Sequence, residues 1–593
     1  MKLFQSLIVA LILLLTCSLA SAEKTQNIDI QIHGIKSDSI RQSIINNIAL
    51  TTAADQPNDN ISLLYQRSLN QIKRLIQPYG YYNPSVDGSL EKDSNHWIAT
   101  FNINLNQPVI IKAVHLTFQG PNHNNPIFTP LKNQTILNQG DILTQSAYNE
   151  LLDKIKKTHY KYGFFDGEIS DKNIQVNLAN HSATVNITVQ PNHRYKVGKI
   201  HLTQHRYEYD PEFIWRFLNI NDGDFFSENK LNKSIKNLQE SDDFASVQLY
   251  PDIENRNKSN YTIDLELLLT SDYARHYTSG IGFSTFQGAT LILGTQFKHL
   301  TPTGHTLGLN TVLSPVRTTF NGTYTIPGNH PNTDHWSLGA QQTFLDTVSF
   351  EERYTDISAN WTHQVSPNLR TTFSIKSVLS RYDTGSNADI DEKISGQGNF
   401  LVGANQLLFR YMDDTHFWPR GFTWNNSFQM TPGNILSSQA FIRDEMNTAI
   451  SLPINPEWNR LFFFTKLGAT NTNDITKLPP SLRFYAGGMN NLLGYNFFSQ
   501  GPRKDGKVIG GKYIATFLGG FEQRIYGNLS ASMYYNLGNA TNQFNFKNTP
   551  ILKAGGIGVS YKTPIGPINL FLSRTMGQTT NRWRFDISIG LSI

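Results

Sequence analysis

Few residues in this chain have the spacing that catalysis or metal binding requires. His330 and His335 lie in the segment Gly328-Asn-His-Pro-Asn-Thr-Asp-His335, and two imidazoles could coordinate a metal ion. The Gly, Pro, Asn and Asp residues around them are typical of a polar turn between strands, and we favour that interpretation. The sequence contains no G-x-S-x-G elbow, phosphate-binding loop or HExxH motif. We therefore predict no catalytic residues, no metal site and no cofactor.

The first residues have the pattern of an export signal. Lys2 precedes the apolar run Leu3–Leu15, and the small residues Ala20-Ser-Ala22 follow, which predicts a cleaved signal peptide at residues 1–22. Cys17 leaves a lipoprotein signal as an alternative, although Thr16 is a poor residue before a lipid-modified cysteine. Cleavage after Ala22 would remove the one cysteine, so we expect neither disulfides nor thiolate ligands in the mature chain.

The bulk composition is that of a folded protein with several domains. The chain has 593 residues, of which 39% are hydrophobic and 12% aromatic, too apolar for a disordered chain. The formal net charge of +5 is too small to indicate a nucleic-acid partner. Beyond residue 22 no apolar run reaches the roughly 18 to 20 residues of a spanning helix, so any membrane-spanning part must be a closed β-barrel.

The N-terminal half repeats a mixed pattern at intervals of about 80 residues. A helix-like segment leads into Tyr79-Gly-Tyr-Tyr-Asn in one copy and into Tyr162-Gly-Phe-Phe-Asp in the next. Thr144 and Ser227 precede helix-like segments as candidate N-caps. Each copy closes with an alternating strand: 99–105, 183–189 and 261–267. The repeats predict three small α+β modules at residues 23–107, 108–191 and 192–271.

From residue 272 onward the pattern changes to short alternating strands. Helical spacing disappears, and Gly, Thr, Ser, Asn and aromatic residues dominate, as in Tyr513–Phe521 and Leu529–Tyr535. The stretch 272–593 has room for about sixteen strands of roughly ten residues. The segment 582–593 alternates up to its last residue, and we expect it to pair with the first strand and close a transmembrane β-barrel. A soluble jelly roll or propeller is the alternative.

Several stretches resemble the outer-membrane assembly superfamily that includes BamA, TamA and the two-partner secretion transporters. The segments that carry this resemblance are Gly280–Gly288 with Thr303-Gly-His305, Leu482–Gly488 through Leu492-Leu-Gly-Tyr495, Gly501-Pro-Arg503, Ile509-Gly-Gly511, Phe521-Glu522, Tyr535-Asn-Leu-Gly538 and Gly556–Pro567. The resemblance implies periplasmic POTRA modules, βααββ in order, before a sixteen-stranded barrel. Three modules rather than five favour the TamA branch, although TamA sequences usually have Asp where this chain has Phe286.

The resemblance also implies a lid loop that enters the barrel, with one departure. An Arg of the family's lid loop normally reaches acidic residues on the inner wall, but Leu493 stands in the Arg position and Asn536 in place of one wall Asp. We therefore expect the loop to be held without charge. The expected lid-loop residues are Gly487, Gly488, Leu492, Leu493, Gly494 and Tyr495; the expected inner-wall residues are Glu522, Arg524, Asn536 and Gly538. For Glu522, a solvated lumen carboxylate and a structural partner role both remain open.

The implied activity is the insertion of other β-barrel proteins, such as autotransporters, into the outer membrane of a Gram-negative bacterium, with the modules in the periplasm. Glycines weaken strand pairing, so we expect an openable seam between the first and last strands. The expected seam residues are Gly280, Gly282, Phe283, Phe585, Ile587, Ile589, Leu591 and Ile593. The expected partners are outer-membrane lipid, unfolded outer-membrane protein clients and a TamB-like protein anchored in the inner membrane. A two-partner secretion transporter, a passive porin and an enzyme are the alternatives.

Overall fold

The computed structural model describes most of the chain: residues 27–51, 60–93, 96–384, 394–413, 416–433, 436–489, 491–564, 566–577 and 582–590. The predicted signal peptide lies outside the described residues. The chain divides into two compact units. The first unit reaches Ile200 and includes 220–232 and 251–265, and the second comprises 201–219, 233–250 and everything from Glu266.

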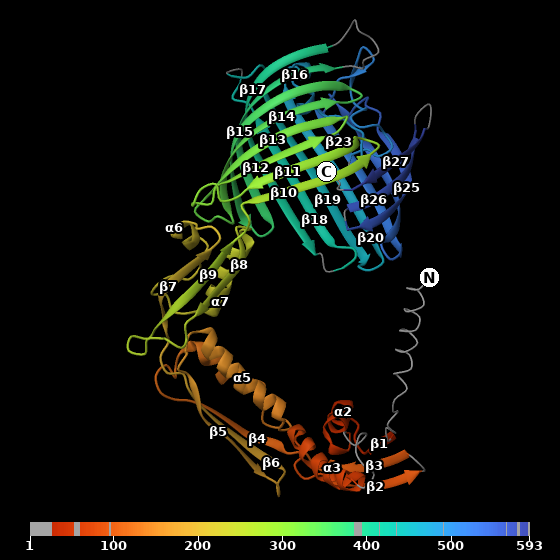
Figure 1. Ribbon diagram of the computed structural model, residues 1–593. Helices are drawn as coiled ribbons and strands as arrows, with labels where there is room; N and C mark the ends of the chain where they lie inside the picture. Colours follow the sequence, from red (N-terminus) through yellow and green to blue (C-terminus); the bar gives the residue numbers. More distant parts are fainter. Residues whose placement is uncertain are drawn as a thin grey trace, which may run out of the picture. The chain divides into compact units, whose positions relative to one another are not determined.

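Three modules with the order βααββ precede the barrel (Figure 1). The first has β1 (Asn27–His33), α2 (Asp38–Asn47), α3 (Ile61–Ile76), β2 (Ser85–Asp93) and β3 (His96–Asn104). The second has β4 (Ile110–Phe118), α4 (Thr129–Lys132), α5 (Gln145–Lys161), β5 (Glu168–Asn177) and β6 (Ser182–Gln190). The third has β7 (Lys196–His205), α6 (Pro211–Trp215), α7 (Glu228–Glu240), β8 (Phe244–Pro251) and β9 (Thr262–Ser271). In each sheet the last strand lies in the centre, which confirms the predicted module architecture; the exact domain boundaries stay predictions.

The second module shows why these sequences fold this way. Strand β6 alternates buried and half-buried residues, and its Val185 and Ile187 belong to the same core cluster as Leu151 and Ile155 of α5. The Thr144 hydroxyl accepts a hydrogen bond from the Ala147 N–H at 3.3 Å, the N-cap that the sequence predicts. No helix among the described residues combines the length and the apolar character needed to cross a bilayer.

The C-terminal half closes into an antiparallel barrel of sixteen strands (Figure 1). Its strands are β10 (Arg275–Ser284), β11 (Gly288–Phe297), β12 (Thr306–Leu313), β13 (Arg317–Pro327), β14 (Asp334–Asp346), β15 (Phe350–Ser366), β16 (Leu369–Thr384), β17 (Ile394–Asp413), β18 (Arg420–Met430), β19 (Phe441–Asn455), β20 (Asn459–Thr472), β23 (Tyr513–Tyr526), β24 (Leu529–Thr541), β25 (Leu552–Thr563), β26 (Gly566–Met576) and β27 (Trp583–Ile589). The closed barrel confirms the predicted fold class and excludes the jelly roll and the propeller.

The two faces of the barrel wall differ in polarity, as strand alternation requires. On the outside, Trp336, Ile357 and Ile375 are more than half exposed. On the inside, polar residues such as Thr343 and Asn536 are fully buried. An apolar outer surface with a polar interior is the pattern of a membrane barrel.

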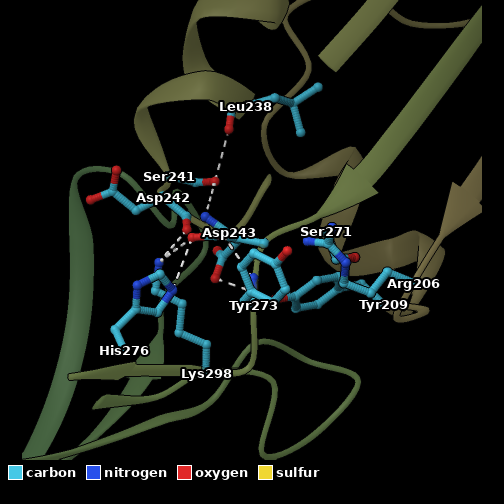
Figure 2. A network of polar contacts seen from close by, with 11 residues as sticks. Arg206, Tyr209, Leu238, Ser241, Asp242, Asp243, Ser271, Tyr273, His276 and Lys298 are labelled. Carbon is cyan, nitrogen blue, oxygen red and sulfur yellow. Dashed lines mark hydrogen bonds and ion pairs between the residues drawn. The ribbon is translucent and has the colours of Figure 1, made fainter. Parts of the chain in front are cut away.

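A polar network joins the third module to the first barrel strands. Lys298, just after β11, is 8% exposed; its Nζ donates to the Asp242 carbonyl and lies 3.2 Å from an Asp272 carboxylate oxygen. The Tyr209 hydroxyl donates to Asp243 at 3.4 Å. Figure 2 shows Lys298, Asp242, Asp243 and Tyr209 within this network. The junction between module and barrel is therefore a packed contact rather than a bare linker.

The Asp243 carboxyl should make this junction sensitive to pH. Burial raises its pKa to about 6, although the charge of Lys298 and the Tyr209 hydrogen bond partly oppose the rise. Because the folded pKa is raised, stability is greatest below the ordinary carboxyl pKa and is lost as the pH rises through about 6. We predict that Asp243→Asn removes this loss and stabilises the third module at pH 7.5 by up to about 3 kcal/mol.

Hydrogen exchange of the β8 and β9 amides at pH 5 and pH 7.5 measures this difference. Asp242→Asn is the matched control, since Asp242 is exposed and binds Lys298 through its backbone carbonyl. An equal pH response in wild type and Asp243→Asn would contradict the prediction.

Candidate functional site

The seam between the first and last strands is the shortest ladder in the described part of the barrel. Strand β27 pairs with β26 over seven residue pairs but with β10 over two, Phe283–Ile589 and Ser284–Ser588. One further backbone hydrogen bond runs from the Thr285 N–H to the Ile587 carbonyl at 3.0 Å. Since ladder hydrogen bonds hold a barrel closed, this is where opening breaks the fewest.

Two glycines set the geometry of the seam. Gly590 has φ +92°, and a Cβ there would lie 2.7 Å from the Ile281 carbonyl oxygen. A Cβ at Gly282 would lie 3.0 Å from the Ile589 carbonyl oxygen. The two backbones approach closely at this point, where β27 (Trp583–Ile589) ends; the expected continuation to Ile593 falls on residues outside the described ones.

The other predicted seam residues fall into three groups. Phe283, Phe585 and Ile589 are 43%, 55% and 41% exposed on the outer surface, whereas Ile587 is half-buried. Gly280 pairs with Ile292 on β11 rather than with β27. Leu591 and Ile593 lie outside the described residues.

A polar link that the sequence analysis missed crosses the seam on the inner side. The Thr285 hydroxyl donates to Asp586 Oδ1 at 2.8 Å, and Arg584 Nε donates to the same oxygen at 2.6 Å. Asp586 is 0% exposed. Strand alternation placed Arg584 and Asp586 on the inner face, but Thr285 is about 300 residues away in the chain, so no local pattern could pair them.

The lid loop, residues 473–512 between β20 and β23, folds back into the barrel. Leu493 is 2% exposed and packs in one cluster with Phe286, Leu518 and Tyr534. The Asn536 amide, on the inner face of β24, donates to the Leu493 carbonyl at 3.0 Å. The Tyr495 hydroxyl donates to the Lys553 carbonyl on β25 at 3.1 Å. The structure thus brings Leu493 and Asn536 together through a backbone hydrogen bond instead of an ion pair.

Glycines let the tip of the lid loop, from Gly487 to Asn496, turn and approach the barrel wall. Gly487, Gly488 and Gly494 have φ of +109°, +114° and +98°, a region that favours glycine. A Cβ at Gly487 would lie 2.1 Å from the Asn496 carbonyl oxygen, and one at Gly494 would lie 3.1 Å from the Ala554 Cβ on β25. Leu492 lies between these glycines and is 0% exposed. The predicted lid residues therefore form one buried turn against the inner wall.

The predicted wall residues have separate roles. Glu522 is 6% exposed and accepts from Arg460 Nη2 at 2.7 Å and from the Ser530 hydroxyl at 2.7 Å, so it is a structural partner. Arg524 instead donates to the Gly527 carbonyl at 2.6 Å. A Cβ at Gly538 would lie 2.2 Å from the Ala515 carbonyl oxygen, so the β23–β24 contact requires glycine there.

Charged side chains do hold the root of the lid loop, the part after β20 that contains Ser481 and Arg483. The sequence analysis did not anticipate these contacts. Glu352 on β15 is 3% exposed and accepts from the Ser481 N–H and hydroxyl, each at 2.8 Å. Arg483 is also buried, and its guanidinium donates to the loop carbonyls of Thr476, Leu478 and Ile509. The expectation of a loop held without charge is thus incomplete, because Glu352 and Arg584 both reach the loop from the wall.

His330 lies in the turn before β14, and His335 lies at the start of β14. The His330 carbonyl accepts from the Thr333 and Asp334 N–H groups, while His335 pairs with Thr362 in the barrel ladder. Within the residues that the structure describes, no group of three or more His, Cys, Asp or Glu side chains could hold a metal ion.

A cavity lies directly behind the seam. Its volume is about 320 Å³, and it is lined by β10 residues, by Ser588 and Ile589 of β27, and by Gly487, Gly488 and Met489 of the lid. The seam, the lid tip and the cavity form one continuous region of the barrel interior.

These features define a class: a transmembrane β-barrel with N-terminal POTRA modules and an inserted lid loop. Residues 300–593 match the family model of the Omp85 superfamily domain, and residues 29–105 match the model of TamA POTRA domain 1. The chain belongs to the Omp85 superfamily and is an outer-membrane protein with periplasmic modules.

The chain is similar to several known proteins. The outer membrane protein assembly factor BamA of Nitratidesulfovibrio vulgaris is 22% identical over 466 residues, which are 74% of this chain and 56% of that protein. The chain thus spans about half the length of this curated relative. The crystal structure of BamA from Haemophilus ducreyi lacking POTRA domains 1–3 has a TM-score of 0.68 at 16% identity, covering 81% of this chain and 99% of that one, and shows the same fold. CdiB from Acinetobacter baumannii aligns over 94% of this chain and 99% of its own with a TM-score of 0.44 and 13% identity.

Gly494 offers a test of how the lid is seated. We predict that Gly494→Ala dislodges the lid tip, because the new methyl group would press on Ala554 and Ser573 in a backbone conformation that alanine disfavours by about 1 to 2 kcal/mol. Maleimide labelling of a cysteine placed at Leu492, which is fully buried, should rise about ten-fold. Gly506→Ala is the matched control, since Gly506 has φ +78° but open space around it. Equal labelling of the two variants would show that wall packing does not seat the lid.

Proposed function

We propose that this protein helps β-barrel clients, such as autotransporters, to insert into or cross the outer membrane through the seam between β10 and β27. The observation that carries the proposal is the ladder at the seam, which has two pairs among the described residues, set against seven pairs on the other side of β27. Members of the Omp85 superfamily are assembly and transport factors, and the proposed role involves no bond chemistry.

The edge of β10 supplies the template for a client strand. In the described ladder, the ten-residue β10 (Arg275–Ser284) uses Phe283 and Ser284 to pair with β27. Among the described residues, 275–282 have no ladder partner on the β27 side. An incoming strand can satisfy their backbone groups by β-augmentation, which removes the penalty of an open edge inside lipid.

The short last strand favours local thinning of the bilayer. Strand β27 has seven residues, which span about 23 Å even without tilt, less than the roughly 30 Å hydrocarbon core. By contrast, β15 and β17 have 17 and 20 residues. A bilayer that thins to match β27 lowers the barrier to insertion beside that strand.

The periplasmic modules favour the TamA branch of the superfamily and a TamB-like partner. The match of residues 29–105 to TamA POTRA domain 1 favours a TamA-like role, in which the partner is a TamB-like protein anchored in the inner membrane. In each module sheet the first and second strands lie at the edges. Unfolded clients or this partner would pair with the parts of these edges that are not already bonded, since β4 and β7 make loop hydrogen bonds at Ile111 and Val197.

A reversible lock tests the gate. We predict that Ser284→Cys with Ser588→Cys, a directly opposed pair at the seam, forms a disulfide that lowers client assembly in cells about ten-fold, and that a reductant restores it. Opposed residues in an antiparallel pair lie close enough for this bond. Surface display of a folded autotransporter is the measurement.

The matched control keeps Ser588→Cys and moves the other cysteine to Asn569, which opposes Ser588 across the closed β26–β27 ladder. This bond should leave assembly unchanged. Normal assembly with the seam fully cross-linked would rule out the gate.

A further inference from the structure

One guanidinium on the last strand contacts three separate elements. Arg584 Nε donates to Asp586 Oδ1 on β27 at 2.6 Å. Its Nη1 donates to the Asn496 side-chain oxygen in the lid tip. The same group lies 4.9 Å from the centre of the Phe286 ring, in the turn between β10 and β11. The lid, the last strand and the first hairpin therefore meet at one side chain.

Asp586 extends this contact across the seam. Its Oδ1 also accepts from the Thr285 hydroxyl at 2.8 Å, and the Ile587 N–H lies 3.4 Å from the Thr285 hydroxyl oxygen. The chain Asn496–Arg584–Asp586–Thr285 thus runs from the lid to the first hairpin through two neighbouring inward residues of β27. The Asp586 side chain is 0% exposed and that of Arg584 is 21% exposed, so water competes little for these bonds.

We propose that Arg584 is a positioning residue that couples the lid to the seam, so that the lid tip stays docked only while β27 remains on β10. This inference rests on the seam being the gate proposed above and names how that gate is regulated. It assigns to the last strand a role beyond closing the barrel.

The lid and the seam are coupled because the charged side chain that holds the lid tip, Arg584, lies on β27. Leu493 and Asn536 lack the charges that would tie the lid tip to β24, and they are joined by one neutral hydrogen bond. The charged tie of the tip is on β27, the strand with the two-pair ladder. When β27 leaves β10, the buried Asp586 carboxylate loses the Thr285 hydrogen bond and keeps the ion pair with Arg584, which it then needs more strongly. Arg584 follows Asp586 and releases Asn496.

Coupling of this kind must act in both directions. A change on the lid side should loosen the seam, and a change on the seam side should loosen the lid. A merely structural role for Arg584 would not produce these crossed effects.

Two reporters in full-length protein in lipid vesicles make the test. The lid reporter is maleimide labelling of Leu492→Cys, and the seam reporter is the oxidation rate of the pair Ser284→Cys and Ser588→Cys, each in an otherwise cysteine-free mature chain. Asn496→Ala, on the lid side, should slow seam oxidation. Thr285→Val, on the seam side, should increase lid labelling. Each effect should be about ten-fold, because a hydrogen bond to a charged group is worth at least that factor.

Two substitutions of Arg584 are compared, so that misfolding of one variant does not leave the test undecided. Arg584→Gln should change both reporters about ten-fold. Arg584→Lys keeps Asp586 neutralised, yet a lysine lacks the planar fork that holds two acceptors at once, so it should fold and still change both reporters. Arg574→Gln is the matched control, since Arg574 lies over the Trp583 ring of β27 on the outer side and should change neither.

The crossed effects decide the outcome. If Arg584→Lys loosens the lid while seam oxidation stays normal, or if Asn496→Ala leaves the seam unaffected, the coupling is overturned. Both reporters are read without any client. Failure of the gate proposal would appear as normal client assembly with a locked seam, and it is therefore distinguishable from failure of the coupling.

Discussion

Backbone hydrogen bonds in lipid have no partner but each other, and this constraint governs the whole barrel. Every strand must be paired along its length or pay a penalty of several kcal/mol per open group. Fifteen ladders of the barrel meet this demand with seven or more residue pairs each, for example sixteen between β16 and β17. Between the described residues, the seam meets it with two. The described seam is therefore the shortest ladder of the wall, and the long ladders confine opening to that position.

The lid follows from the size of the barrel. Sixteen strands enclose a lumen that side chains alone do not fill, and the loop 473–512 enters it. The root of the loop is fixed to β15 through Glu352 and Ser481, whereas its tip packs on β23 and β24 through Leu493, Leu518 and Tyr534. Apart from the hydrogen bond that Arg584 donates to Asn496, the tip is held by apolar packing and single neutral hydrogen bonds, which are individually weak. A tip held in this way can leave the wall without stranding a charge, and a root held by a buried carboxylate cannot.

Local patterns predicted the architecture because each module and strand obeys a local rule. Alternation identified β6, β9 and β27, and the repeated Tyr-Gly-aromatic segments revealed the modules. The same patterns placed Asp586 and Glu522 on the inner face. They could not supply the partners, since Arg460 is 62 residues from Glu522, Asn496 is 88 from Arg584, and Thr285 is 301 from Asp586. Pairings over such distances depend on register, which closure of the barrel sets and no short window contains.

At Leu493 and Asn536, where the family resemblance predicts a charged pair, this chain has a neutral hydrogen bond. Removing a cation from the lid together with an anion from the wall avoids an unpaired buried charge. In this structure the charged contact has the reverse arrangement: the cation, Arg584, is on the barrel wall, and the neutral acceptor, Asn496, is in the lid. The contact involves β27 rather than β24. A tie to β24 would hold the lid to a strand that is fully paired on both sides. A tie to β27 instead holds it to the strand with the fewest bonds on one side, so the position of the lid and the state of the seam share one interaction energy and cannot vary independently.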